Sequence, residues 1–463
     1  MATIFEDYTS KFAGSRELWG KAHRIIPSGI NHDGRFISPF PLFMDHAQGC
    51  RKWDIDGHEF IDLCTGHGSL ILGHGHPTIL KALNEAAGKF THPSAPTPYE
   101  VRWAELIISM VPCAEMVRFQ LSGTEATMLA MRLARAHTGR DIVVKIRGHF
   151  HGWHDYAMIG YMAPYEIPSS AGVPKGVASA MRVVPLNDLA AMEAALTPRD
   201  VAAVIIEADG PGAGTVPVKT GYLQAVRDLT KTYGAILIFD EVITGFRFAP
   251  GGAQEFYGVT PDLSTFAKAV CGGVPGGAVA GRAEIMADLA FRSDDPEFNR
   301  KKRVRHQGTF SANPITAAVG VATLEILKDG HVQKQCMTLA DRLKAGFSNA
   351  LREAGAAGAL YGAHSTMRLI VGDDLPKIYD PVAFPMAVDA ERLLQNVKQP
   401  LLKALQCAQL LEGIDILGCT HGWTSGIMTE KDIDEAVARW ERALHRVIAE
   451  GYLSGKAKVF ATA

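Results

Sequence analysis

Short apolar runs alternate with longer amphipathic stretches through the middle of the chain, between Met116 and Arg282. This alternation is typical of strands joined by crossover helices, so it predicts a mostly parallel sheet. Several runs are apolar throughout, as expected of strands that helices cover on both faces. The predicted strands are residues 116–120, 142–146, 201–207, 235–240, 263–267 and 277–281, and the predicted helices between them are residues 125–136 and 221–233.

The pattern changes on both sides of this block. Residues 53–61 predict a hairpin around Asp56-Gly57, and residues 337–354 predict an amphipathic helix. We therefore expect an α/β protein with a large domain at 66–330. A smaller α+β domain would combine an N-terminal segment at 1–65 with residues 331–463. Proline, glycine and serine crowd residues 162–176, which predicts a mobile surface loop.

Composition narrows the class of protein. The 463 residues are 47% hydrophobic and 21% charged, which is ordinary for a globular protein. Lys and Arg total 47 against 49 Asp and Glu, so no basic excess indicates nucleic acid or an anionic membrane as a partner. The seven cysteines form no CxxC pair and predict reduced thiols. With no signal-peptide pattern and no apolar stretch of about 20 residues, a cytoplasmic protein is expected.

The strongest chemical signal is a carboxyl group and an amine at the ends of two predicted strands. Asp240 ends one apolar run and Lys268 ends the next. Strands of a parallel sheet deliver such residues to the crevice at their carboxyl ends. A lysine in apolar surroundings loses its charge more easily and can form a Schiff base with a carbonyl. If that carbonyl belongs to pyridoxal phosphate, Asp240 would hold a proton on the ring nitrogen. A buried ion pair or two surface groups would explain the same residues.

A second signal lies between a predicted strand and a predicted helix. In the sequence LSGTEA, residues 121–126, small residues precede the helix start. Free N–H groups there, with the hydroxyls of Ser122 and Thr124, can hold a phosphate at the positive end of the helix. Simple N-capping by one of these hydroxyls is the alternative.

Two further segments have competing interpretations. In GHFHGWHD, residues 148–155, three histidines suggest metal ligands, but no nearby cysteine or carboxylate pattern completes a zinc arrangement, so no metal is predicted. Phe150 or the ring of His151 could instead stack on a planar cofactor, or the loop could simply be packed. The run RKKRVR, residues 300–305, is interpreted as a solvated loop.

Taken together, the motifs SGTEA, FHG, FDEVITGFR, TFAKAVCGG and HQGTFSANPITAA resemble those of the class III (subgroup II) aminotransferases, which are pyridoxal-phosphate enzymes of fold type I. The resemblance covers most of the chain. Within the family, the sequence is most similar to the branch that contains glutamate-1-semialdehyde 2,1-aminomutase and D-phenylglycine aminotransferase. In EVRWAELI, GHFHGWHD and HQGTF it resembles the latter more closely.

The resemblance implies roles for individual residues. Lys268 matches the lysine that binds the cofactor covalently and moves the proton during catalysis, and Asp240 matches the partner of the pyridine nitrogen. A homodimer is implied because Thr309 matches a residue that contacts the phosphate of the neighbouring subunit. The other matched cofactor-binding positions are Ser122, Gly123, Thr124, Phe150, His151, Glu207 and Val242.

The sequence departs from the family pattern at two places. Phe150 replaces the commoner tyrosine, so a phenol is lost. In EADGPGAG, residues 207–214, Gly212 stands where relatives often have an asparagine near the cofactor's 3′-oxygen. Arg35 matches an arginine that lies near the substrate carboxylate in the aminomutase branch, and a guanidinium suits a carboxylate. An exposed loop arginine is the alternative.

These observations favour an aminotransferase that moves an amino group between a carboxylate-bearing amino acid, of the aromatic D-phenylglycine type, and a 2-oxo acid. The alternatives within the family are glutamate-1-semialdehyde 2,1-aminomutase and a β-amino-acid aminotransferase. A cofactor-binding regulator without turnover and a metal hydrolase that uses GHFHGWHD are the alternatives from other classes. The regulator would need a DNA-binding module, and no such pattern is visible before Trp53 or after Ala436.

Overall fold

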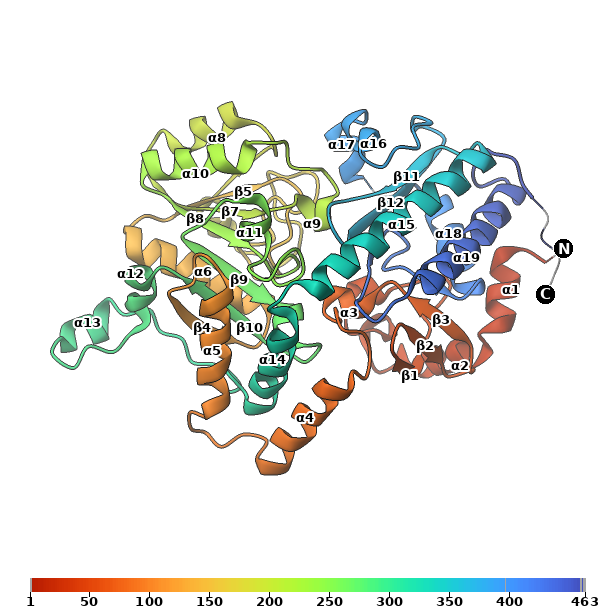
Figure 1. The fold of residues 1–463 in the computed structure, drawn as a ribbon. Helices are drawn as coiled ribbons and strands as arrows, with labels where there is room; N and C mark the ends of the chain where they lie inside the picture. The colour runs from red at the N-terminus through yellow and green to blue at the C-terminus, as the bar shows by residue number, and fades with distance from the viewer. Residues whose placement is uncertain (1, 396, 459, 461–463) are drawn as a thin grey trace. The chain divides into compact units, whose positions relative to one another are not determined.

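The computed structural model describes residues 2–395, 397–458 and 460, and the chain divides into two compact units (Figure 1). Unit 1 comprises residues 1–76 and 334–463, and unit 2 comprises Pro77–Gln333. The sequence placed the two domain boundaries at 65/66 and 330/331. Each unit has its own sheets and its own buried residues, so each is described by itself.

Unit 2 is built on a seven-stranded sheet with the strand order β4-β10-β9-β8-β7-β5-β6. The pairs β6–β5, β5–β7, β7–β8 and β8–β9 are parallel, whereas β10 runs antiparallel to both β9 and β4. The predicted α/β fold with a mostly parallel sheet is confirmed. The strands are β4 (Met116–Gln120), β5 (Ile142–Ile146), β6 (Met181–Val184), β7 (Val201–Glu207), β8 (Ile236–Asp240), β9 (Leu263–Ala267) and β10 (Gly277–Gly281).

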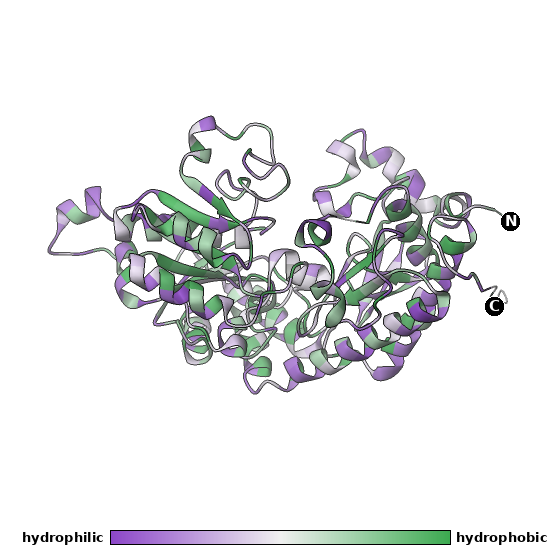
Figure 2. Cartoon of the chain, turned by 90° about the horizontal axis from the view of Figure 1, so that it is seen from above, coloured by the Kyte–Doolittle hydropathy of each residue, from purple (hydrophilic) through white to green (hydrophobic). Residues whose placement is uncertain are grey.

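One face of this sheet packs against helix α6 (Gly123–Thr138). Buried residues of α6 form a single apolar cluster with Val143, Ile205 and Ile238, which lie on three neighbouring strands. These three residues identify the face of the sheet that α6 covers, because residues two apart along a strand point to the same side. Figure 2 shows hydrophobic residues concentrated along these strands. The helix begins two residues earlier than predicted, because Ser122 caps it.

Most of the remaining elements of unit 2 lie around the sheet, whereas α13 projects away from it (Figure 1). Among them, α14 packs against α4 and α5, and α8 packs against α10. The helical elements are α4 (Pro77–Lys89), α5 (Pro98–Met110), α7 (Lys175–Ala178), α8 (Leu189–Leu196), α9 (Pro211–Gly214), α10 (Tyr222–Tyr233), α11 (Ala253–Tyr257), η3 (Lys268–Cys271), α12 (Ala283–Met286), η4 (Ala287–Leu289), α13 (Pro296–Lys301) and α14 (Pro314–Leu327).

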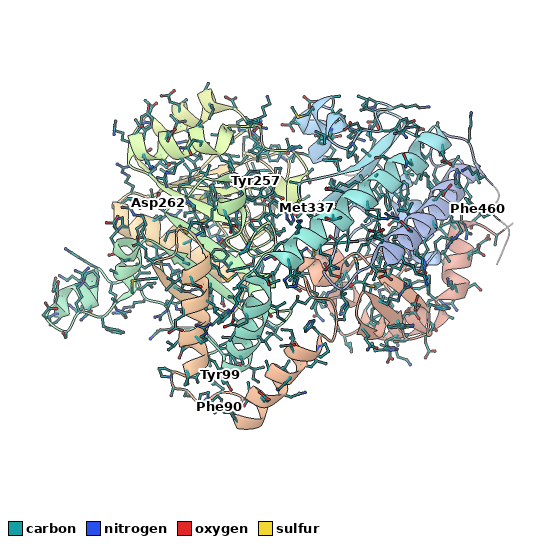
Figure 3. All side chains as sticks on the ribbon, viewed as in Figure 1. Phe90, Tyr99, Tyr257, Asp262, Met337 and Phe460 are labelled. Carbon is teal, nitrogen blue, oxygen red and sulfur yellow. The ribbon has the colours of Figure 1, made fainter. Side chains whose placement is uncertain are left out.

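A buried carboxyl group, Asp262, stabilises the end of the sheet opposite the predicted site. Asp262, labelled in Figure 3, directly precedes β9 and accepts hydrogen bonds from Arg227 at 2.8 Å and Arg282 at 3.1 Å. Its Oδ2 also accepts the backbone N–H of Leu237 at 2.8 Å. These contacts join β8, β9 and β10 at the amino end of the parallel strands.

Unit 1 contains two small sheets and a group of long helices. Its sheets have the orders β1-β2-β3-β13 and β11-β12-β14, and β2 and β3 form the predicted hairpin. Phe347 of α15 stacks on Trp440 of α19 with ring centroids 4.0 Å apart. The strands are β1 (Met44–Gln48), β2 (Arg51–Asp54), β3 (Glu59–Asp62), β11 (Gly358–Tyr361), β12 (Thr366–Val371), β13 (Ile414–Asp415) and β14 (His421–Trp423).

Helix α15 begins earlier than the predicted residue 337, at His331. Among the described residues, no helix combines the length and the apolar character that crossing a bilayer needs. The other helical elements of unit 1 are α1 (Ile4–Lys11), α2 (Ala13–Ala22), η1 (Pro27–Gly29), η2 (Asp33–Arg35), α3 (Thr65–Gly68), α16 (Ala383–Met386), α17 (Ala390–Leu394), α18 (Leu401–Leu411) and α19 (Glu430–Ala449), and α15 itself spans His331–Ala354.

Candidate active site

A row of buried polar side chains crosses the α6-facing side of the large sheet. The register pairs Glu207 with Asp240 and Asp240 with Thr265, and paired residues point to the same face. Lys145 is paired with Ile205, two residues before Glu207, so it shares this face. We call Lys145, Glu207, Asp240 and Thr265 the polar row. All four are buried, with at most 6% of any residue exposed.

Asp240 is the centre of the polar row. Its Oδ2 lies 2.7 Å from Nδ1 of His151, and its Oδ1 accepts the N–H of Val242 at 3.1 Å and the hydroxyl of Thr265 at 3.2 Å. Complete burial lowers the pKa of His151, so the imidazole is neutral near pH 7 and donates from Nδ1. Its Nε2 has no partner among the described residues. A buried carboxylate whose hydrogen-bond partners are all uncharged can accept a cationic group.

Lys268 follows directly after β9, at the start of η3. Its φ of 53° is in the left-handed region, which a residue with a side chain rarely adopts. Burial lowers the pKa of Lys268 to about 8, although Asp240 and Glu207 oppose this shift. An amine with this pKa is partly unprotonated at neutral pH and is a competent nucleophile. The covalent role of Lys268 stays a prediction.

The loop before α6 lies beside these residues. Ser122 caps the helix by accepting the N–H of Glu125 at 3.2 Å, so the predicted capping role is present. The first N–H groups of a helix have no partner within it, and they remain able to bind an anion. A Cβ on Gly123 would lie 3.0 Å from both methyl groups of Val242 and 3.5 Å from Ala267. The loop is therefore in contact with the residues that follow β8 and with the end of β9.

The segment 148–154 is held against α6 and the polar row. Thr127 of α6 donates to the carbonyl of His151 at 2.6 Å, and its hydroxyl lies 3.3 Å from Nε2 of His154. His149 accepts the N–H of Glu207 at 2.9 Å. These contacts tie the histidines to α6 and to the polar row. Phe150, between them, is 44% exposed, and its ring centroid lies 5.0 Å from that of Tyr161.

Glu207 connects this segment to the loop after β7. Its two carboxyl oxygens accept the N–H groups of Phe150 at 2.7 Å and Gly212 at 3.1 Å. Burial, together with the neighbouring Asp240, raises the pKa of Glu207 well above its ordinary value. In the structure Glu207 orients backbone around the site. The sequence had assigned it a cofactor contact, which stays a prediction.

The two remaining predicted residues lie elsewhere. Thr309 is exposed in a turn of unit 2, and its predicted role is in a neighbouring subunit. Arg35 is exposed at the end of η2 in unit 1, where it lines a cavity of about 480 Å³ with His67 and Lys52. Both roles stay predictions.

Three residues of the site were not predicted from the sequence: Lys145, Thr127 and Thr265. Lys145 could have been noticed in the sequence, because it lies inside the apolar run IVVKI and lysine is rarely buried. The two threonines lie within ordinary helix and strand patterns, so the sequence offered no comparable signal for them.

Gly152 gives a test of the contact between the segment 148–154 and α6. A Cβ there would lie 2.5 Å from Oγ1 and 2.8 Å from Cα of Thr124, and its φ is 96°. We expect Gly152→Ala to destabilise the protein by about 3 kcal/mol and to weaken cofactor binding, because Thr124 must move. The measurements are thermal unfolding and cofactor titration of the apoprotein.

The control is Gly172→Ala. Gly172 also has a positive φ, 86°, but a Cβ added to it would have no neighbouring atom within 4 Å. The Gly172→Ala protein should lose only about 1 kcal/mol of stability, from the strain of an alanine at positive φ, and should bind cofactor normally. Equal effects of the two substitutions would contradict a role for the contact with Thr124.

Comparison with known proteins identifies the family. The model of the family "Aminotransferase class-III" matches residues 35–362. The chain belongs to the class-III aminotransferase family. It is 41% identical over 374 residues to a glutamate-1-semialdehyde 2,1-aminomutase of Methanothrix thermoacetophila, and the match covers 80% of this chain and 85% of that protein. Residues 35–362 include the whole polar row and Lys268.

Solved structures agree with this assignment. An omega-transaminase from Sphaerobacter thermophilus has a TM-score of 0.83 and 31% identity, covering 93% of this chain and 97% of that one. A structure described as a transaminase with PLP bound also has a TM-score of 0.83 and 31% identity, covering 95% and 99%. The protein is a pyridoxal-phosphate-dependent enzyme with the fold of the type I aminotransferases.

The chemistry of the site fits this cofactor. Pyridoxal phosphate presents an anionic phosphate, a basic ring nitrogen and an aldehyde. The site presents a helix N-terminus at Ser122, a buried carboxyl group at Asp240 and an amine of lowered pKa at Lys268. When bound, the cofactor supplies a ring that accepts electrons from the substrate carbon.

Proposed function

We propose that this class-III aminotransferase moves the amino group of a carboxylate-bearing substrate, and that the 2,1-rearrangement of glutamate-1-semialdehyde is the first reaction to test. The observation that carries this choice is the 41% identity over 374 residues to a protein named for that activity. The match extends over 85% of that protein. The sequence alone favoured an intermolecular aminotransferase. The comparisons give better support to the alternative, the aminomutase.

The proposed roles follow from the contacts in unit 2. Lys268 would bind the cofactor covalently and then carry the proton between the substrate carbon and the cofactor. Asp240 would keep the ring nitrogen protonated, with His151 and Thr265 holding its carboxylate in place. The residues proposed to bind the phosphate are Ser122, Gly123 and Thr124, and those proposed to pack on the two faces of the ring are Phe150 and Val242.

Two proposed roles lie outside this set. Arg35 would bind the substrate carboxylate, for which its planar guanidinium is suited. Thr309 would complete the phosphate site of a second subunit, so the active form would be a homodimer.

Intermolecular transamination is the second candidate, and a specific observation favours it. Gly212 donates its backbone N–H to Glu207 and brings no side chain to the position where relatives often carry an asparagine. The omega-transaminase and the PLP-bound transaminase are both 31% identical to this chain. An aromatic or β-amino acid with a 2-oxo acid would be the substrate pair.

One assay separates the two reactions. The holoenzyme is incubated with glutamate-1-semialdehyde, with and without a 2-oxo acid, and formation of 5-aminolevulinate is followed. An aminomutase forms this product without an acceptor. A parallel panel of aromatic and β-amino acids is read by the cofactor's absorbance change in half-reactions. Acceptor-dependent turnover of these amino acids, with no 5-aminolevulinate, would replace the aminomutase by the transaminase.

A further inference from the structure

Lys145 is a buried amine that the proposed mechanism does not use. It lies in β5 with none of its surface exposed, and it faces the same side of the sheet as Glu207 and Asp240. Within the described part of the chain, its Nζ makes one hydrogen bond, to the carbonyl of Ala157 at 2.8 Å, and no ion pair. An ammonium has three protons to donate, so the charged form of Lys145 is poorly compensated.

Incomplete compensation makes the charge of Lys145 sensitive to pH. Burial lowers the pKa of Lys145 to about 7, while Glu207 and Asp240 partly oppose this shift. A lysine with this pKa is positively charged below about pH 7 and neutral above it. Its charge therefore changes in the physiological range, on the same face of the sheet as the carboxyl group proposed to face the cofactor's ring nitrogen.

The acidic groups that sense this change come from β7, which pairs with β5, and from β8, the next strand beyond β7. Glu207 faces Lys145 from β7 and Asp240 faces it from β8. Lys268 is the other amine close to these two carboxyl groups. The charge of Lys145 therefore acts on the same carboxyl groups as the amine proposed to bind the cofactor.

Three histidines face Lys145 from the loop after β5. His149, His151 and His154, in the loop after β5, have lowered pKa values because they are buried, so they are neutral near pH 7. Helix α6 contacts this loop through Thr124 and Thr127, which do not titrate, and through Arg135, whose guanidinium lies over the ring of Tyr156 and keeps its charge throughout this range. Among the described residues on this side, Lys145 is thus the group whose charge changes near pH 7.

We infer that Lys145 is a positioning residue whose protonation competes with the cofactor's protonated ring nitrogen for the carboxyl groups of Glu207 and Asp240, and so links cofactor affinity to pH. The inference rests on the cofactor orientation given under the proposed function. Two positive charges near the same carboxylates repel each other. The cofactor should therefore bind more tightly above about pH 7, where Lys145 is neutral, and binding should lower the affinity of Lys145 for its proton.

The test uses the full chain with Lys268→Ala, so that no covalent bond forms, and pyridoxamine 5′-phosphate as the ligand. Its dissociation constant is measured by equilibrium dialysis between about pH 6 and about pH 8. Lys145→Gln is compared in the same background. Glutamine can keep a donor toward the carbonyl of Ala157 but cannot titrate, so a merely structural role would not change the pH profile. The phosphate of the ligand titrates equally in both proteins.

We expect the affinity of the protein that retains Lys145 to rise between these pH values by about fivefold more than the affinity of the Lys145→Gln protein. The profile of Lys145→Gln should follow only the titration of the ligand. Lys145→Met, which lacks both the donor and the charge, should show the same profile as Lys145→Gln. Lys344→Met is the control and should keep the steeper profile, because Lys344 is also buried but bonds Gly362 and His364 in unit 1.

Identical pH profiles for the protein with Lys145 and for both neutral variants would overturn the inference. A profile that flattens in Lys145→Met but not in Lys145→Gln would also overturn it, because the hydrogen bond to Ala157 would then be responsible. Circular dichroism and thermal unfolding of each apoprotein show whether a variant is folded. If Lys145→Met does not fold, Lys145→Gln carries the comparison. Neither result depends on which substrate the enzyme uses, so the proposed reaction is tested separately.

Discussion

Replacing Lys268 with alanine is expected to reduce turnover by about 10⁴-fold or more, because both the covalent attachment and the proton carrier are lost. Cofactor should still bind without a covalent bond, since Asp240 and the loop before α6 are unchanged. Steady-state kinetics of the reconstituted variant measure the first effect, and dialysis measures the second. Lys231→Ala, in the exposed part of α10, is the control and should retain full activity.

A chemical test addresses the same residue without kinetics. Borohydride reduction of the holoenzyme should fix the cofactor on one lysine, and peptide mapping should identify it as Lys268. The lowered pKa of Lys268 and its position directly after β9 support this expectation. A label on Lys145 or any other lysine would refute the assignment. It would leave the family membership intact, because that rests on the whole sequence.

Asp240→Asn is expected to reduce kcat/KM by about 10³-fold, or about 4 kcal/mol of transition-state stabilisation. A neutral amide cannot hold the proton on the ring nitrogen, so the ring accepts electrons less readily. The fold should survive because an amide oxygen can still accept the N–H of Val242 and the hydroxyl of Thr265. The readouts are half-reaction rates and circular dichroism.

Thr265→Val is the matched control for Asp240→Asn. It removes one hydrogen bond from Oδ1 but leaves the negative charge, so a loss of less than about tenfold is expected. Rates of Asp240→Asn close to those of the wild type would show that its charge is not used. Equal losses in both variants would mean that the orientation of the carboxyl group matters, rather than its charge.

The α/β class, most strands of the large sheet and the main candidate residues could be predicted from the chain alone. The uninterrupted apolar runs in 201–206 and 235–239 require burial on both faces, and this predicts strands without knowledge of the fold. Asp240 and Lys268 were predicted because charged residues that end such runs are otherwise unfavourable. Strand β6, of four residues, was missed because so short a run carries little periodic signal.

Which polar groups meet depends on strand order and register, and the pattern of apolar and polar residues along the chain reveals neither of them. The direction of β10 cannot be predicted from GAVAG, because an apolar strand has the same pattern in either direction. The polar row draws its four residues from four strands that are far apart in sequence. On their shared face, burial lowers the pKa of Lys145, and burial together with Asp240 raises the pKa of Glu207. Because these shifts depend on distances between strands, the polar row and the unusual amine of Lys145 became visible only in the fold.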